Sequence, residues 1–95
     1  MSTAAGKRHM GRVAALGCIV CDLKGYPETP AQVHHIREGR IARNDFLTIP
    51  LCEGHHTGTP LSVHMSRELL LLSLRVGSEF DLLAVVMERL APAKR

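Results

Sequence analysis

Residues 33–39, VHHIREG, place two histidines side by side in a stretch that is typical of a β-strand. Side chains in a strand point alternately to its two faces, so His34 and His35 cannot share one ligand face. We therefore interpret one of them as a metal ligand and the other as a group that acts on a water molecule. The strand is predicted over 31–37. A second β-favouring run over 46–52 predicts the other half of a hairpin.

The composition indicates one small folded domain that is rich in histidine. The chain has 95 residues, of which 45% are hydrophobic, a fraction too high for a disordered chain. The formal net charge of +3 suits a polyanionic partner without requiring one. The first residues lack the apolar segment of a secretory signal, and the longest apolar run, LLLLSL (69–74), is too short to span a membrane. With three cysteines, which cannot all pair within one chain, we expect a cytoplasmic protein with reduced thiols.

Helical periodicity marks both ends of the chain. Residues 3–16 are predicted to form a helix, and two more helices are predicted after Met65, separated by Gly77 and with Ser78 starting the second. The second helix is predicted to end at Pro92. The predicted stripes are Met10, Val13 and Leu16 in the first helix, Leu69, Leu72 and Val76 with Leu70 and Leu74 beside them in the next, and Phe80, Leu83, Met87 and Leu90 in the last. The C-terminal helices are expected to form most of the core and to carry no chemistry.

Two short-spaced pairs of metal-ligating residues predict a structural zinc site. Cys18 and Cys21 form a C-x-x-C, and Cys52 and His55 form a C-x-x-H. Two residues between ligands allow one tight turn to present both to one ion, and the four together match a closed tetrahedral Cys₃His site. Buried free cysteines beside a surface histidine are one alternative. A redox-active C-x-x-C is another, but it normally has a helix directly after the motif, and the sequence predicts a tight knuckle over 18–26 instead.

Besides His9 in the first predicted helix, four histidines remain once His55 is assigned to zinc. His56 is then free to point elsewhere, as His34 and His35 do, and His64 precedes the long helical region. Each of these alone is more often a solvated or hydrogen-bonded residue than a ligand. Together, beside a zinc scaffold, they favour a second metal site, because neutral imidazole is a common ligand.

The order of these ligands resembles that of the HNH, or ββα-metal, endonuclease superfamily, and more narrowly that of the phage recombination-enhancement, RecA-dependent nucleases. The segments that carry the resemblance are GCIVC (17–21), VHHIREG (33–39), TIPLCEGHH (48–56) and GTPLSVH (58–64). The resemblance runs from about Gly17 to Leu90 and implies an α+β fold with a zinc-stapled ββα-metal core over about 17–65. An N-terminal helix and a C-terminal helical region over about 65–91 complete a single domain of residues 1–95.

The resemblance implies metal-dependent hydrolysis of phosphodiester bonds in DNA. It assigns the general base to His35, the catalytic metal to His34, His56 and His64, and the structural zinc to Cys18, Cys21, Cys52 and His55. Imidazole has a pKa near neutrality, as a base that takes a proton from water requires. Three imidazoles favour a transition metal such as Zn²⁺, Mn²⁺, Ni²⁺ or Co²⁺ over Mg²⁺ as the second ion.

The chain departs from the family pattern in the connection after the histidine strand. Relatives tend to have a longer, glycine-rich connection, whereas REGRIARND (37–45) is compact and basic. Asn44 is the candidate for the middle residue of the HNH triad, which would brace the loop and help to orient His35. Asn-Asp pairs are also common in turns, so an ordinary turn role for Asn44 is an equally open alternative.

Three arginines in the same connection indicate contact with phosphate. Arg37, Arg40 and Arg43 recur at every third residue, and guanidinium groups suit bidentate phosphate contacts, although a solvated face is the alternative. The scarcity of aromatic residues favours recognition of the DNA backbone over base stacking. The resemblance adds a recombination-protein filament as a partner and a phage or prophage protein in the bacterial cytoplasm.

Two non-enzymatic functions remain open at this point. One is a zinc-binding module of phage or prophage origin that binds nucleic acid or a protein, in which the histidines outside the zinc site are incidental. The other is a phage assembly factor that forms a homo-oligomer through the helix containing LLLLSL. The sequence does not indicate the oligomeric state.

Overall fold

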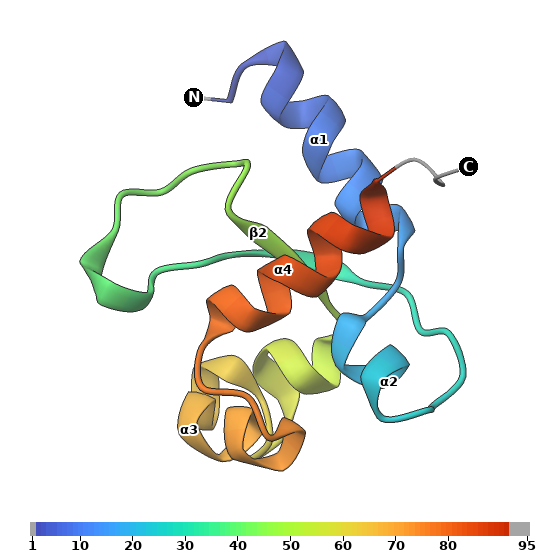
Figure 1. Ribbon diagram of the computed structural model, residues 1–95, viewed down its shortest axis with the longest axis vertical. Coiled ribbons are helices and arrows are strands. Elements are labelled where there is room, and N and C mark those ends of the chain that lie inside the picture. Colours follow the sequence, from blue (N-terminus) through green and yellow to red (C-terminus); the bar gives the residue numbers. More distant parts are fainter. Residues whose placement is uncertain (1, 92–95) are drawn as a thin grey trace.

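The computed structural model describes residues 2–91, which form a small α+β fold with two antiparallel strands and four α-helices (Figure 1). The elements in chain order are α1 (Ala4–Ala15), α2 (Ile19–Leu23), β1 (Gln32–His35), η1 (Glu38–Arg40), β2 (Thr48–Leu51), η2 (Gly54–Gly58), α3 (Val63–Leu74) and α4 (Glu79–Leu90). No helix between residues 2 and 91 is long and apolar enough to cross a membrane. Pro92, the predicted end of the last helix, and the outermost residues of the predicted domain lie outside the described residues.

The two strands form the predicted hairpin. In their register His34 lies opposite Ile49 and His35 opposite Thr48. The connection, residues 36–47, projects from the body of the molecule and contains η1 (Figure 1). The Glu38 carboxylate in η1 accepts a hydrogen bond from the backbone N–H of Glu79 at 3.1 Å, which ties this connection to the start of α4.

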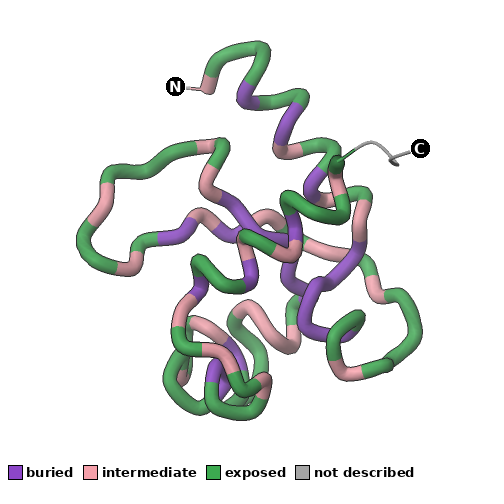
Figure 2. The backbone as a smooth tube through the Cα atoms, viewed as in Figure 1, coloured by how far each residue is buried: buried purple, intermediate pink, exposed green. Residues whose placement is uncertain are grey.

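The core lies between the hairpin and the helices. Helix α4 crosses the hairpin, α1 packs against both strands, and α2 packs against β2. Figure 2 shows the buried residues concentrated where these elements meet and few of them along the projecting connection. The buried hydrophobic residues are Val13, Cys18, Ile19, Val20, Cys21, Ile36, Ile49, Leu51, Cys52, Leu70, Leu71, Leu82 and Val86.

The buried face of α4 lies one position away from the predicted stripe. Glu79, Leu82 and Val86 are buried, whereas the predicted Phe80 and Met87 are 39% and 50% exposed. Both sets recur at i, i+3 and i+7, and apolar residues surround most of this helix. The helical period therefore does not distinguish the two faces, and contacts with the sheet decide between them.

The predicted stripe of α3 is wrong at two of its three positions, although Val76 and the neighbouring Leu74 pack against the core. Leu70 and Leu71 are buried, whereas Leu69 and Leu72 are 51% and 72% exposed. Four consecutive leucines place an apolar side chain on every face, so the pattern contains no directional information. Helix α3 is also interrupted at Ser66, whose φ of −157° and ψ of 88° are extended and separate its first turn from the rest.

The knuckle after the first cysteine contains a short helix. Cys18 is the N-cap of α2, and its sulfur accepts a hydrogen bond from the backbone N–H of Cys21 at 3.4 Å. The sequence predicts a tight knuckle with no helix directly after the motif, and the structure adds one short helix that includes Cys21. Helix α2 is only five residues long and ends at Leu23, because Gly25 turns the chain with a φ of 75°.

Candidate active site

Three thiols and one imidazole converge where α2, β2 and η2 meet. Cys18 and Cys21 come from the start of α2, Cys52 follows β2, and His55 lies in the wide turn η2. His55 Nδ1 lies 3.6 Å from the sulfur of Cys18, 3.6 Å from that of Cys21 and 3.3 Å from that of Cys52. The sulfurs of Cys21 and Cys52 are 3.8 Å apart. All four residues can therefore offer a ligand atom to one ion.

These distances fit a tetrahedral metal site. Zinc bonds of about 2.3 Å to sulfur and about 2.0 Å to nitrogen give tetrahedral edges of about 3.8 Å between sulfurs and about 3.5 Å between sulfur and nitrogen. The observed separations match these edges. A disulfide would require sulfurs about 2.05 Å apart, and all three cysteines are free. The predicted ligand set is thus assembled as four residues that can hold a metal ion.

Burial, hydrogen bonds and a nearby charge set the protonation of this cluster. Burial raises the pKa of the Cys18 thiol to about 12. Burial also tends to raise the pKa of Cys52, but hydrogen bonds from the backbone N–H of His55 and from the other two thiols outweigh it and lower that pKa. The pKa of His55 is lowered by burial and by the charge of Lys24, which keeps the ring neutral. Metals bind thiolates and neutral imidazoles, so loading this site releases protons.

Three other imidazoles gather on the far side of the same turn. His34 comes from β1, His56 from η2 and His64 from the first turn of α3. The ring centroids of His34 lie 5.2 Å from His56 and 5.3 Å from His64, and those of His56 and His64 are 4.7 Å apart. One nitrogen from each ring lies within 4.8 Å of the others. Adjacent residues of a helical turn point in different directions around its axis, which explains why His55 and His56 reach different clusters.

Two of these rings are oriented by hydrogen bonds from one ring nitrogen to an oxygen acceptor. His34 Nε2 lies 2.6 Å from Glu79 Oε1, and His56 Nδ1 lies 2.7 Å from Gln32 Oε1. Because a carboxylate or amide oxygen accepts, we assign the proton to these two nitrogens, which leaves Nδ1 of His34 and Nε2 of His56 as lone pairs. The pKa of His56 is lowered by burial and by the neighbouring rings of His34 and His64. The donor set therefore fits a metal ion.

Glu79 is a member of this site that the sequence interpretation missed. Its side chain is 1% exposed and also accepts a hydrogen bond from Arg67 at 3.1 Å. Burial tends to raise its pKa, but hydrogen bonds from His34 and Arg67 outweigh burial and lower the pKa. Helix α4 therefore contributes a carboxylate to the candidate site, which the prediction for the C-terminal helices did not include. The available signal was a carboxylate in an apolar stripe, since Glu79 continues the spacing of Leu82 and Val86.

The carboxylate beside His35 belongs to Asp45. His35 Nε2 lies 2.8 Å from Asp45 Oδ1. Asn44 instead accepts a hydrogen bond from the backbone N–H of Phe46 at 2.8 Å, so it braces the loop as an Asx turn and does not contact the ring. Hydrogen bonds from the Ser2 side chain and from His35 lower the pKa of Asp45. An ionised Asp45 accepts from Nε2–H, which leaves Nδ1 of His35 as the free lone pair.

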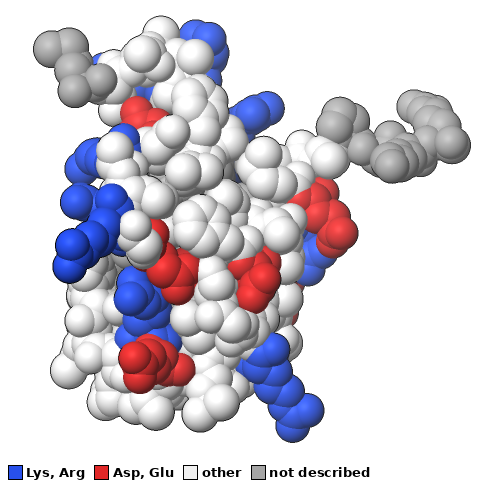
Figure 3. All heavy atoms as spheres, turned by 60° about the vertical axis from the view of Figure 1, so that its left-hand side comes forward, with Lys and Arg blue, Asp and Glu red and all other residues white. Residues whose placement is uncertain are grey.

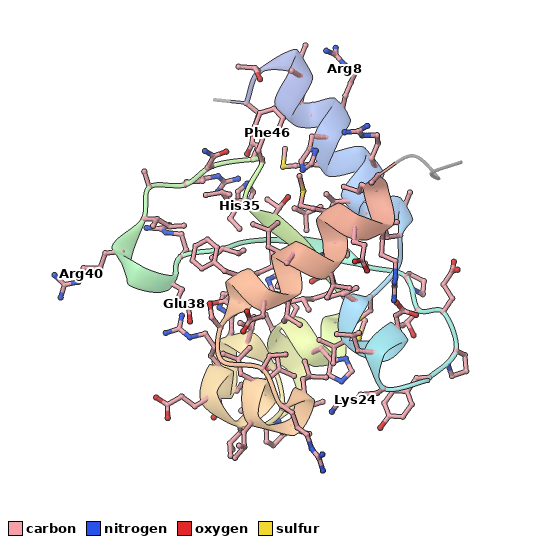
Figure 4. The ribbon with its side chains drawn as sticks, viewed as in Figure 1. Arg8, Lys24, His35, Glu38, Arg40 and Phe46 are labelled. Atoms are coloured by element: carbon pink, nitrogen blue, oxygen red, sulfur yellow. The ribbon has the colours of Figure 1, made fainter. Side chains whose placement is uncertain are left out.

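One shallow cleft joins these groups. Its volume is about 360 Å³, and it is lined by Val33, His34, His35, Arg37, Arg43, His56 and His64. His34 and His35 contact different elements, α4 and the projecting connection, yet both border this cleft. Of the three predicted arginines, Arg40 does not line it and points away from the body of the molecule (Figure 4). Figure 3, in which the side of the molecule with the projecting connection comes forward, shows several Lys and Arg side chains there with Asp and Glu side chains between them.

Comparison with known proteins identifies the family. The model of the family described as "Recombination enhancement, RecA-dependent nuclease" matches residues 2–91. Searches of curated proteins and of solved structures found no significant match. The family match spans nearly the whole chain and every residue of both ligand clusters. The chain therefore belongs to the recombination-enhancement, RecA-dependent nuclease family.

Proposed function

We propose that this protein is a metal-dependent HNH endonuclease that hydrolyses phosphodiester bonds in DNA and has a separate structural zinc. The observation that carries the proposal is the pair of adjacent but distinct donor sets. One is rich in thiols, buried and complete, and the other consists of three imidazoles open to a cleft beside His35. Closed sites are typical of structural zinc, and sites with open positions are typical of catalytic metals. Membership of a nuclease family supports the same conclusion.

In this proposal one cluster would stabilise the fold and the other would take part in the chemistry. Cys18, Cys21, Cys52 and His55 would hold Zn²⁺ and join α2, β2 and η2. His34, His56 and His64 would hold the second divalent ion, for which three nitrogen ligands favour Zn²⁺, Mn²⁺ or Ni²⁺ over Mg²⁺. When bound, this ion would neutralise charge on the scissile phosphate and on the leaving oxygen.

His35 would act as the general base. Its Nε2 is engaged by Asp45, so Nδ1 is the nitrogen that takes the proton from a water molecule in the cleft. As this proton transfers, the ring becomes positively charged, and the adjacent Asp45 carboxylate stabilises that charge. The water then attacks phosphorus in line with the departing oxygen. Asp45 thus fixes both the tautomer and the orientation of the base.

Arginines beside the cleft would hold the substrate. Arg37 and Arg43 line it, so their guanidinium groups can contact phosphates on either side of the bond that is cut. Arg40 points away and would contact a more distant phosphate. Such contacts read the backbone, which predicts weak sequence preference. The family description supports a RecA filament as a partner, and we place the protein in the bacterial cytoplasm as a phage or prophage product.

Plasmid cleavage tests the proposed function. Zinc-loaded protein is incubated with supercoiled DNA, with and without RecA filaments, while a second divalent metal is supplied or withheld. We expect nicked or linear product only when the second metal is present. DNA that stays intact with every metal, both with and without RecA, would contradict the proposal.

Glu79→Gln tests whether the carboxylate behind His34 supports the second metal. The amide keeps a hydrogen-bond acceptor but loses the negative charge, so we expect affinity for the second ion to fall roughly 10- to 100-fold, as is typical when an outer partner of a ligand is changed. Calorimetric titration of the zinc-loaded protein with Mn²⁺ measures this. Glu88→Gln, on the exposed side of the same helix, is the matched control and should bind Mn²⁺ like wild type. Equal affinity in both variants would exclude this role for Glu79.

A further inference from the structure

Helix α1 lies against the loop residue that contacts His35. Gly6 is buried in the first turns of this helix, at its contact with Asp45. A Cβ atom built on Gly6 would lie 2.7 Å from Asp45 Oδ2 and 3.2 Å from Asp45 Cβ. The other carboxylate oxygen, Oδ1, is the one that contacts His35. Glycine therefore allows the helix to lie this close to the Asp45 carboxylate. Any residue with a Cβ atom at this position would require the carboxylate or the helix to move.

A second contact holds the same part of the loop. His9, one turn after Gly6, is 5% exposed, and its ring centroid lies 5.0 Å from that of Phe46, which directly follows Asp45. Figure 4 shows Phe46 beside α1, with His35 below it. His9 Nε2 is buried and has no hydrogen-bond partner among the described residues, so this ring serves the contact by packing. Helix α1 thus contacts two consecutive residues of the connection.

We propose that α1 is a positioning element of the active site. Its close approach at Gly6 and its packing at His9 keep Asp45 in contact with His35, which holds the base in its working tautomer. This inference rests on the role of His35 in the proposed function, but the geometry it describes can be measured without any nuclease activity. Gly6 is a positioning residue, since it reaches the base only through Asp45. The projecting connection has few buried contacts of its own, so the helix supplies the support that the connection lacks.

The chain contains a matched pair of glycines for the test. Gly11 lies in the same helix, and a Cβ there would meet no atom within 4 Å. Alanine is favoured over glycine inside a helix, so Gly11→Ala should raise the temperature of thermal unfolding and leave the site unchanged. Gly6→Ala gains the same helix propensity but forces Asp45 to move. The main difference between the two variants is the clash with the carboxylate, because the other close atom at Gly6, Thr3 Oγ1, would lie 3.3 Å from the added Cβ.

The experiment compares Gly6→Ala with Gly11→Ala in zinc-loaded protein by NMR and by plasmid cleavage. We expect the hydrogen-bonded imidazole N–H signal of His35 to be present in wild type and in Gly11→Ala and lost in Gly6→Ala. We expect kcat of Gly6→Ala to fall roughly 10- to 100-fold, the range found when a supporting partner is lost. In an Asp45→Ala background, Gly6→Ala should add no further loss, because the two changes remove the same contact.

The outcomes separate this inference from the proposed function. An unchanged His35 signal and unchanged cleavage in Gly6→Ala would overturn the inference and leave the nuclease intact. Loss of the signal in Gly6→Ala, together with a wild-type protein that cuts no DNA, would support the inference and contradict the proposed function. If Gly6→Ala does not fold, Phe46→Ala removes the other contact from an exposed position, and a wild-type His35 signal in that variant would overturn the inference.

Discussion

His35→Ala is expected to lower kcat for plasmid nicking by roughly 10² to 10⁴, the range that a positioned general base contributes. The ring is partly exposed at the edge of the cleft, and removing it disturbs neither ligand cluster. The variant should therefore fold and bind metal like wild type. The measurement is single-turnover cleavage with saturating second metal, together with zinc content and thermal unfolding of the same sample.

Imidazole in the buffer provides a control for this variant. The lost ring leaves space beside an open cleft, so free imidazole can enter and take the proton in its place. We expect partial recovery of cleavage by His35→Ala with added imidazole and no stimulation of wild type. Cleavage by His35→Ala at the wild-type rate would show that another group is the base.

Removal of the zinc that we propose for the thiol cluster is expected to unfold the protein. A zinc site of this type contributes about 10–16 kcal/mol of binding free energy, whereas small domains are stable by only about 5–15 kcal/mol. The thiol cluster joins α2, β2 and η2, and the remaining core is small. A strong zinc chelator should abolish the cooperative thermal transition, and added Zn²⁺ should restore it, as followed by circular dichroism.

Two adjacent histidines provide the matched comparison for this prediction. His55→Ala removes a ligand of the thiol cluster, so we expect it to unfold at a lower chelator concentration than wild type. His56→Ala removes a ligand of the imidazole cluster from the same turn and should unfold like wild type. Equal chelator sensitivity of the two variants, or a chelator-treated protein that keeps its transition, would show that the thiol cluster does not stabilise the fold.

The thiol cluster was predictable from the sequence because its residues lie in two short patterns, whereas the set His34, His56 and His64 came from the family resemblance. In C-x-x-C, C-x-x-H and the paired histidines, a few residues separate the side chains. The local geometry of a strand or a turn then determines which way each of these side chains points. The hairpin was predictable for the same reason, since each strand is a local β-favouring run. Strand alternation also explains why His34 and His35 contact different residues, Glu79 and Asp45.

Tertiary partners of these residues were not predictable from local patterns. Glu79 contacts His34 across 45 residues of sequence. Asp45 lies next to the predicted Asn44, and only the fold of the loop decides which of the two side chains faces His35. The buried faces of α3 and α4 were missed because these helices are apolar on most sides. The orientation of these helices depends on which apolar surface the sheet and the ligand clusters leave exposed.

The central claim is that two metal ions occupy two separate sites in one chain. The most direct test is a crystal structure of metal-loaded protein with anomalous scattering measured at the absorption edges of zinc and manganese. We predict two peaks, a zinc peak enclosed by Cys18, Cys21, Cys52 and His55 and a second peak among His34, His56 and His64. A single peak at the thiols, with the three imidazoles empty under excess metal, would contradict the account.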